Sequence, residues 1–292
     1  KKNSIDILLN SPVTSIKRDN KSVEVKNGAE FLYKKLVIAT GSKLNKLDFD
    51  NNTEGTYYLK NINDSKQIKS LLDFQQKIVV IGAGYIGLEI AAAARKKDRE
   101  VTVLEADQRV MGRSVCQQTS NFFEAIHQRE GVNFLFNTQI KNIQESENKK
   151  RISLNDGKAI DADAIIIGIG VRPRTGLAVA AGLNCKDGIT VNELCQTSDE
   201  NIFAIGDCAN YPNAIFDLRL RLESVQNAID HAKIAASKIN ETGPPDHEIP
   251  WFWSDQYHVK LKIAGISKDY DAYALRGEIS EDKFSIFYLR KG

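Results

Sequence analysis

A glycine-rich turn is the first group of residues whose spacing suits a particular chemistry. Gly82, Gly84 and Gly87 follow a short apolar run, Ile78–Ile81, and precede an alanine-rich segment typical of a helix. In this order the first glycine permits the strand-to-helix turn, the second lets the backbone approach a pyrophosphate, and the third lets the helix pack close to the sheet. The helix N-terminus then offers N–H groups to phosphate. The spacing predicts a dinucleotide site; the alternative is a purely structural turn.

An acidic residue downstream bears on which dinucleotide is bound. Glu105 directly follows the next predicted strand, Val101–Leu104. A carboxylate there accepts hydrogen bonds from the ribose hydroxyls of NADH and repels the 2′-phosphate of NADPH; the alternative is a solvated strand-end carboxylate. Arg109 and Arg113 lie further on, where either can soften this discrimination. Glu89 is either an exposed helix carboxylate or a group directed at the nicotinamide, and its position leaves both open.

Other predicted strands also end in residues that suit a ligand. Asp207 follows a buried strand and a glycine, where a short carboxylate can hold a sugar-like polyol; the alternative is a turn aspartate that caps the next segment. Lys35–Ala39 leads into Thr40 and Gly41, a weak signal alone. Gly170 lies in a glycine-rich turn where a planar ring can approach the backbone.

The elements that must position these residues follow from periodicity and turn signals. Asn27-Gly28 predicts a hairpin between Ser22–Val25 and Phe31–Tyr33. Apolar runs joined by a glycine turn and a helix predict a βαβ unit from about Lys77 to Leu104. Gly243-Pro244-Pro245 is the clearest linker. Further helices are predicted at Asp64–Phe74 (capped by Asp64 or Ser65), Asn121–Arg129 and Leu222–Ile239, further strands at Val132–Phe136, Ala164–Ile169, Ile202–Ile205, Val259–Ala264 and Ser285–Leu289, and a meander with turns at Glu147–Lys150 and Asn155–Gly157 from Ile140 to Ile160.

Composition sets the broad class. The chain has 292 residues, 42% hydrophobic and 27% charged, with net charge +2, as expected for a soluble protein of about two domains. Neither the charge nor any apolar run points to nucleic acid or membrane. The four cysteines form no closely spaced pair, which disfavours a zinc site or a thioredoxin-type pair and suits a reducing cytoplasm. Met111 is the only methionine, and both ends fall in strand-like regions, so we expect truncation at both ends.

Four motifs in order resemble the flavoproteins with two dinucleotide-binding domains. They are Ala39–Gly41, Gly82–Glu89 with Glu105, Gly168–Pro173 and Thr197–Ala209. Arg221–Ala228 and Pro250–Tyr257 look like the ferredoxin, putidaredoxin and rubredoxin reductase branch. The resemblance implies an α/β fold in which a Rossmann-like NADH domain is inserted into a Rossmann-like FAD domain, followed by the start of a small α+β C-terminal domain. The implied ranges are 1–74 and 195–246 for FAD, 75–194 for NADH and 247–292 for the C-terminal domain.

The resemblance also implies the site residues. The FAD residues would be Thr40, Gly41, Asp207 (on the ribityl chain), Glu223, Ser224, Val225, Trp251 and Trp253. The NADH residues would be Gly82, Gly84, Ile86, Gly87, Glu89, Glu105, Arg113 and Gly170, with Glu89 and Gly170 beside the nicotinamide. Lys43 departs from the Arg-Pro that relatives often carry after the Thr-Gly turn, which weakens the prediction of local FAD contacts.

The implied activity is electron transfer from NADH through FAD to a small acidic ferredoxin or a rubredoxin. Flavin performs this chemistry, so no side chain is essential to it, although Glu89 and Trp253 are candidates; Trp253 either gates electron exit or is a packed aromatic. The alternatives are an NADH oxidase, peroxidase or nitrite-reductase-type flavoprotein, and an NADH-responsive binding protein resembling apoptosis-inducing factor. We expect a cytoplasmic monomer or weak dimer. Five basic residues either form a docking face for the acidic carrier or are merely scattered surface charge: Arg219, Arg221, Lys260, Lys262 and Arg290.

Overall fold

The protein divides into two compact units. The computed structural model describes residues 4–48, 54–146, 149–243 and 249–291. One unit, here called the first unit, comprises Lys1–Lys43 and Arg172–Phe252, and the second comprises Leu44–Val171 and Trp253–Gly292. Pro244 and Pro245 of the predicted linker and the first two residues of the predicted 147–150 turn lie outside the described residues.

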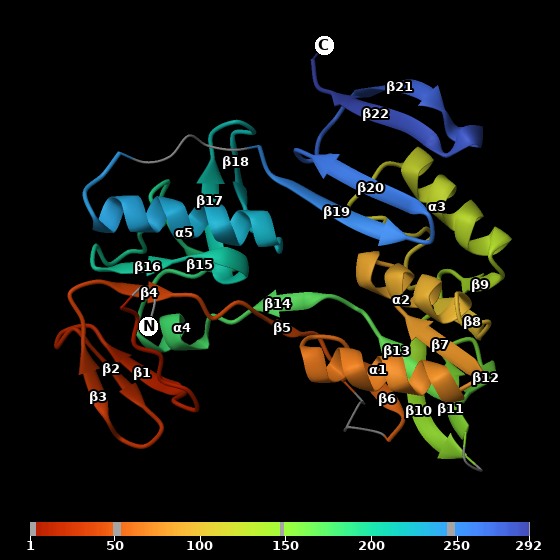
Figure 1. Ribbon diagram of the computed structural model, residues 1–292, viewed down its shortest axis with the longest axis horizontal. Helices are drawn as coiled ribbons and strands as arrows, with labels where there is room; N and C mark the ends of the chain where they lie inside the picture. The colour runs from red at the N-terminus through yellow and green to blue at the C-terminus, as the bar shows by residue number, and fades with distance from the viewer. Residues whose placement is uncertain (1–3, 49–53, 147–148, 244–248, 292) are drawn as a thin grey trace. The chain divides into compact units, whose positions relative to one another are not determined.

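A five-stranded parallel sheet forms the centre of the second unit, in the order β6-β13-β7-β8-β9 (Figure 1). Its strands are β6 (Thr56–Tyr58), β7 (Lys77–Ile81), β8 (Glu100–Leu104), β9 (Val132–Leu135) and β13 (Ala164–Ile167). Buried on both faces, the central strands read as continuous apolar runs. The predicted βαβ unit is therefore present, with α2 between β7 and β8.

The helices cover one face of this sheet and an antiparallel meander covers the other. Alternate residues divide between the two layers: Ile78 and Val80 join the helix-side core, whereas Val79 and Ile81 join the meander-side core. The helices are α1 (Ile62–Phe74), α2 (Tyr85–Arg95) and α3 (Gln117–Arg129), and the meander consists of β10 (Ile140–Ser146), β11 (Lys149–Leu154) and β12 (Ala159–Ala162).

The start of α1 differs from the sequence prediction. Asn61 is the N-cap, and its side chain accepts the N–H groups of Asn63 and Asp64. Asp64, one of the two predicted caps, is instead the third helical residue, and its carboxylate accepts the N–H of Asn61. This reciprocal capping box satisfies more orphan donors than a cap at Asp64 would. The helix therefore begins two residues earlier than predicted.

Two C-terminal hairpins belong, from Trp253 on, to the second unit. Leu261, Ile263 and Phe284 pack against the helix-side core, so this segment is held by apolar burial. Its elements are β19 (Trp251–Gln256), paired with β20 (Val259–Ala264), and β21 (Ala272–Glu278), which leads through the 3₁₀ turn η2 (Ile279–Glu281) to its partner β22 (Lys283–Leu289).

The first unit combines small sheets with α5. The parallel pair β4–β16 lies at its core, with Ile38, Ile202 and Ala204 buried. Ser224 caps α5, so the predicted helix from Leu222 begins later, at Val225. The elements are β1 (Val13–Lys17), β2 (Ser22–Val25), β3 (Glu30–Leu32), β4 (Leu36–Ile38), α4 (Gly176–Ala180), β15 (Ile189–Thr190), β16 (Ile202–Ala204), the 3₁₀ turn η1 (Gly206–Cys208), β17 (Ala209–Asn213), β18 (Leu218–Leu220) and α5 (Val225–Ile239).

The boundaries of the two compact units differ from those of the predicted functional domains. The chain passes between the units through β5 (Ser42–Leu44) and β14 (Val171–Pro173). Residues 44–74, predicted with the first FAD segment, join the second unit because β6 pairs with β13 in the parallel sheet. The ranges of the cofactor domains remain a prediction.

Candidate cofactor sites

The glycine-rich turn between β7 and α2 has two glycines that the fold requires and one that it does not. A Cβ on Gly87 would lie 2.0 Å from the carbonyl oxygen of Gly82. A Cβ on Gly82, whose φ is +100°, would lie 2.6 Å from the carbonyl oxygen of Gly168. Gly84 has φ −77°, and a Cβ there would meet nothing within 4 Å. The open space beside Gly84, at the N-terminus of α2, fits a pyrophosphate.

Glu105 lies at this turn, held by two backbone donors. The N–H of Ala83 donates to its Oε2 at 2.6 Å, and the N–H of Asp107 donates to its Oε1 at 2.9 Å. Hydrogen bonds to a carboxylate are charge-assisted and fix its orientation. Each oxygen keeps a further lone pair, so the group can also accept a hydroxyl hydrogen bond. The tertiary structure therefore brings the acidic strand end and the glycine turn together.

Arg113 and Gly170 are also neighbours in the second unit. A Cβ on Gly170, which has φ +88°, would lie 3.8 Å from Arg113 Nη2 and 3.7 Å from Asn45 Nδ2. The N–H of Asn45 donates to the carbonyl of Gly170 at 3.0 Å, which fixes this turn. The Arg113 side chain is exposed. By contrast, the Arg109 guanidinium donates to the carbonyls of two nearby residues and so is committed to its own loop.

The remaining predicted NADH residues lie on α2. Ile86 is in its first turn and half exposed. Glu89 is one turn further along, and its Oε1 accepts the hydroxyl hydrogen of Ser254 at 2.6 Å. Glu89 is half-buried and hydrogen-bonded, which disfavours the first of its two alternatives, an exposed helix carboxylate. Ser254 was not among the predicted site residues.

In the first unit, Asp207 stands where β16 and β4 end together. The hydroxyl of Ser42 donates to Asp207 Oδ2 at 2.8 Å, although the two residues are 165 positions apart. The hydroxyl of Thr40 donates to the carbonyl of Arg174 at 2.7 Å, and the N–H of Arg174 donates to the carbonyl of Gly41 at 2.9 Å. The structure thus places the Thr-Gly turn and the carboxylate at one edge of the parallel pair.

The start of α5 lies against the same turn. Gly206 has φ +68°, and a Cβ there would lie 3.5 Å from the Cβ of Ala228. Ser224 accepts the N–H of Asn227, while Val225 is exposed. Asp207 offers a carboxylate that suits a polyol, and Gly41 and this helix start offer backbone groups that suit a flavin edge. Trp251, also in this unit, is 40% exposed.

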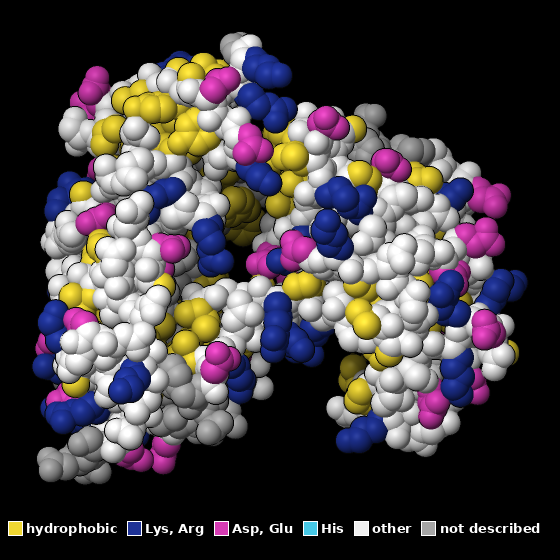
Figure 2. All heavy atoms as spheres, turned by 180° about the vertical axis from the view of Figure 1, so that it is seen from behind, with side chains coloured by type: hydrophobic (Ala, Val, Ile, Leu, Met, Phe, Trp, Pro, Cys, Tyr) yellow, Lys and Arg dark blue, Asp and Glu magenta, His cyan; other side chains and the backbone are white. Residues whose placement is uncertain are grey.

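Glu223 and two of the predicted docking residues are already engaged. Arg221 pairs with Asp187 at 2.9 Å and with Glu223, and its side chain is only 13% exposed. Arg219 donates to Asn210 and to the carbonyl of Val191 at 2.8 Å. On the face shown in Figure 2, cationic and anionic side chains are interspersed. These observations favour scattered charge over a basic face for this pair of arginines.

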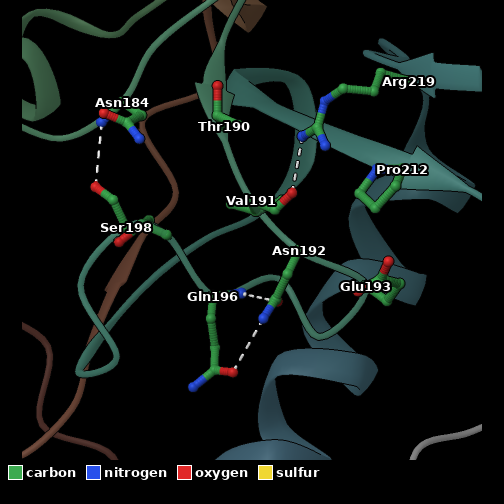
Figure 3. Close-up of a pocket in the computed structure, with 10 residues that line it drawn as sticks. Asn184, Thr190, Val191, Asn192, Glu193, Gln196, Ser198, Pro212 and Arg219 are labelled. Atoms are coloured by element: carbon green, nitrogen blue, oxygen red, sulfur yellow. Dashed lines mark hydrogen bonds between the residues drawn. The ribbon is translucent and has the colours of Figure 1, made fainter.

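Arg219 also borders a polar pocket, shown in Figure 3. The pocket has a volume of about 340 Å³, and its wall includes Asn192 and Gln196, which hydrogen-bond to each other. The predicted FAD residues do not line it. It therefore stands apart from the candidate FAD site.

The four cysteines are free thiols. Within the described ranges, no group of His, Cys, Asp and Glu side chains could hold a metal ion. Among the described helices, none combines the length and the apolar character needed to cross a membrane.

Sequence reasoning missed several polar partners of the candidate residues. Ser42 and Ala83 are local neighbours of the motifs, but their contacts with Asp207 and Glu105 are long-range. Ser254 and Gln256 are fully buried, alternating with exposed residues on β19. Polar residues at period two within an aromatic strand are a signal that could have marked them.

The parallel sheet with its glycine turn and acidic strand end defines a dinucleotide-binding protein of the α/β class. Residues 1–232 match the family described as pyridine nucleotide-disulphide oxidoreductase, and residues 251–292 match the reductase C-terminal family. The chain belongs to the pyridine nucleotide-disulphide oxidoreductase family. Members of this family bind FAD and NAD(H), and the predicted fold of Rossmann-type domains with a small C-terminal domain is confirmed.

Individual relatives are similar along almost the whole chain. Rhodocoxin reductase of Rhodococcus erythropolis is 40% identical, over 97% of this chain and 67% of that protein. Rubredoxin-NAD(+) reductase of Pseudomonas putida is 40% identical, over 92% of this chain and 70% of that protein. The crystal structure of the covalent putidaredoxin reductase–putidaredoxin complex matches with a TM-score of 0.93 at 38% identity, over 96% of this chain and 69% of that one.

Proposed function

We propose that this protein is an NADH-dependent flavoprotein reductase that passes electrons through FAD to a ferredoxin or rubredoxin. The observation that carries the NADH half is Glu105, held at the glycine turn by Ala83 with acceptor capacity to spare. The carrier half is supported by the similarity to rhodocoxin, putidaredoxin and rubredoxin reductases.

The second unit would bind NADH. The open space beside Gly84 takes the pyrophosphate, and the first N–H groups of α2 donate to it. Glu105 accepts the ribose hydroxyls and disfavours a 2′-phosphate. Arg113, beside Gly170, adds a cation near the nicotinamide half of the site. Each contact binds and orients the dinucleotide.

The first unit would hold FAD. Asp207, fixed by the Ser42 hydroxyl, accepts hydrogen bonds from the ribityl chain. Gly41 and the start of α5 offer backbone groups, and glycine at position 206 adopts the positive φ of this turn without strain. Flavin, when bound, accepts a hydride and releases electrons one at a time, which suits a one-electron carrier. The chain's own task is to bind, align and exclude water.

The proposal extends to the compartment, the oligomeric state and the docking residues. Free thiols at all four cysteines suit a reducing cytoplasm. We expect a monomer or weak dimer that meets its acidic carrier transiently. Since Arg219 and Arg221 are committed within the first unit, the lysines of β20, Lys260 and Lys262, are the better candidates for docking.

The test is anaerobic reduction of a panel of ferredoxins and rubredoxins by the FAD-loaded, full-length protein, with NADH and NADPH in parallel. Rapid reduction of one carrier by NADH, with NADPH much poorer, is the expected result. Flavin reduction with consumption of oxygen or peroxide but no carrier turnover would move the protein to the oxidase or peroxidase class. NADH-induced association with negligible turnover would instead indicate a binding protein.

A further inference from the structure

A continuous chain of hydrogen bonds runs through the second unit and ends on Glu89. It consists of Tyr257, His127, Gln256, Ser254 and Glu89, and is called the β19 polar chain below. The successive heavy-atom distances are 3.2 Å (Tyr257 Oη to His127 Nδ1), 2.8 Å (His127 Nε2 to Gln256 Oε1), 3.1 Å (Gln256 Nε2 to Ser254 Oγ) and 2.6 Å (Ser254 Oγ to Glu89 Oε1). The chain links α3 to α2 by way of β19.

The carboxylate at one end fixes the direction of every donor. An ionised carboxylate only accepts, so the Ser254 hydroxyl donates to Glu89 and must accept from the Gln256 amide. The Gln256 amide oxygen is then the acceptor for His127 Nε2–H. His127 Nδ1 is left unprotonated and accepts from the Tyr257 hydroxyl. All four hydrogens therefore point toward Glu89, and each donor polarises the next.

Burial restricts the side chains of the β19 polar chain to few arrangements. The side chains of Ser254, Gln256 and His127 have no exposed surface. Burial lowers the pKa of the His127 imidazole, in keeping with the neutral form that the donor pattern requires. A buried polar group without a partner is costly. The chain is therefore held to one arrangement, and so is the Glu89 rotamer at its end.

Glu89 lies on α2, the helix that follows the glycine turn. Glu89 is four positions after Tyr85, the first residue of α2, so it lies about one helical turn from the start of the helix. Ser254 and Gln256 belong to the C-terminal segment that matches the reductase C-terminal family. The β19 polar chain thus connects that segment to the nucleotide-binding helix.

We infer that Ser254 and Gln256 are positioning residues, which act through Glu89 to hold its carboxylate against the nicotinamide end of NADH. The inference rests on the proposed function and on the position of Glu89 beside the nicotinamide, which the family resemblance implies. It assigns to β19 a part in dinucleotide recognition in addition to any contact with flavin.

The first test is calorimetric titration of the FAD-loaded, full-length protein with NAD⁺ and, separately, with ADP-ribose, which lacks the nicotinamide. Ser254→Ala should weaken NAD⁺ binding about tenfold, since a hydrogen bond to a charged group is lost. It should leave ADP-ribose binding within about twofold. Equal weakening of both ligands would show a purely structural role and overturn the inference.

A double-mutant cycle tests whether Ser254 acts through Glu89. Glu89→Ala and the Ser254→Ala/Glu89→Ala pair should bind NAD⁺ with the same affinity, because alanine at position 89 has no acceptor and the second change then removes a donor whose target is already gone. Additive losses would contradict the proposal. Ser254→Thr keeps the hydroxyl and should restore NAD⁺ binding, which also separates the effect from a failure to fold.

A second measurement follows the chain itself. The Nε2–H tautomer of His127 should be visible by nitrogen NMR, and Gln256→Leu, which removes its acceptor, should change that signal and weaken NAD⁺ binding in parallel with Ser254→Ala. The matched control is Ser267→Ala, which removes another hydroxyl of the C-terminal segment, bonded to the Ser114 carbonyl at 3.0 Å. This control should leave NAD⁺ binding and the His127 signal unchanged; a loss equal to that of Ser254→Ala would refute the proposal.

The two failures are distinguishable. If the unsubstituted protein bound neither NAD⁺ nor ADP-ribose, the proposed function would fall and the inference with it. If it bound both and reduced a carrier, while Ser254→Ala and Gln256→Leu bound NAD⁺ normally, only the positioning role would be wrong.

Discussion

The three glycines of the turn before α2 should respond differently to alanine. At Gly87 the added Cβ would lie 2.0 Å from a backbone oxygen, where ordinary contact begins at 3.4 Å. Overpacking of this kind costs about 3 kcal/mol or more. The better helix propensity of alanine recovers about 1 kcal/mol. Gly87→Ala should therefore lose at least about 2 kcal/mol, which lowers Tm by at least roughly 4 °C.

At Gly84 the same change should affect the ligand and not the fold. The Cβ meets no protein atom within 4 Å, and φ −77° suits any residue. Loss of a glycine N-cap costs about 0.5–1 kcal/mol, and reduced freedom of the unfolded chain offsets about the same amount. Tm should stay within roughly 2 °C. The Cβ instead occupies the space of the pyrophosphate, so the Kd for NAD⁺ should rise about tenfold or more.

The assay pairs thermal unfolding with NAD⁺ titration for both variants. Gly87→Ala gives the stability effect that Gly84→Ala should lack. A fall in Tm for Gly84→Ala as large as for Gly87→Ala, or an unchanged NAD⁺ affinity, would refute the assignment of the space beside Gly84 to the dinucleotide.

Three further predictions test other parts of the sites. Glu105→Gln should lower kcat/KM for NADH about tenfold and leave NADPH unaffected or improved; equal losses with both would contradict its role at the ribose. Asp207→Ala should reduce the flavin-to-protein absorbance ratio more than Ser42→Ala, since Ser42 only orients the carboxylate; equal retention of flavin would argue against it. Burial lowers the pKa of His231 to about 4, below about 6.5 in the unfolded chain. The unfolded state thus binds more protons between these values, so stability complete above about pH 6.5 should be lost as pH falls toward 4, by about 3 kcal/mol. His231→Asn, which keeps an acceptor for the Gly206 N–H, should flatten a plot of Tm against pH, and an unchanged slope would exclude His231 as its cause.

Local chemistry made much of the fold predictable from the sequence. Glycine spacing, apolar runs and the Asn27-Gly28 turn are signals within a few residues, and β2, β7, β8 and β20 formed where those signals lie. Where two local signals compete, the boundary was missed: α1 begins at Ile62 because the Asn61 capping box outweighs a cap at Asp64. The place of β6 was also not predictable, because its partner β13 lies more than 100 positions away.

The sequence by itself determined the prediction of which residues bind a dinucleotide, because that prediction depends on short spacings: Gly82, Gly84 and Gly87, with an acidic residue after the next strand. Only the tertiary structure decided which groups hold those residues. The Ser42 hydroxyl reaches Asp207, and the Ser254 hydroxyl reaches Glu89, each across 165 positions. A periodic pattern shows which face of a strand is buried but not what it is buried against, so the partner of each carboxylate emerges only when the elements pack.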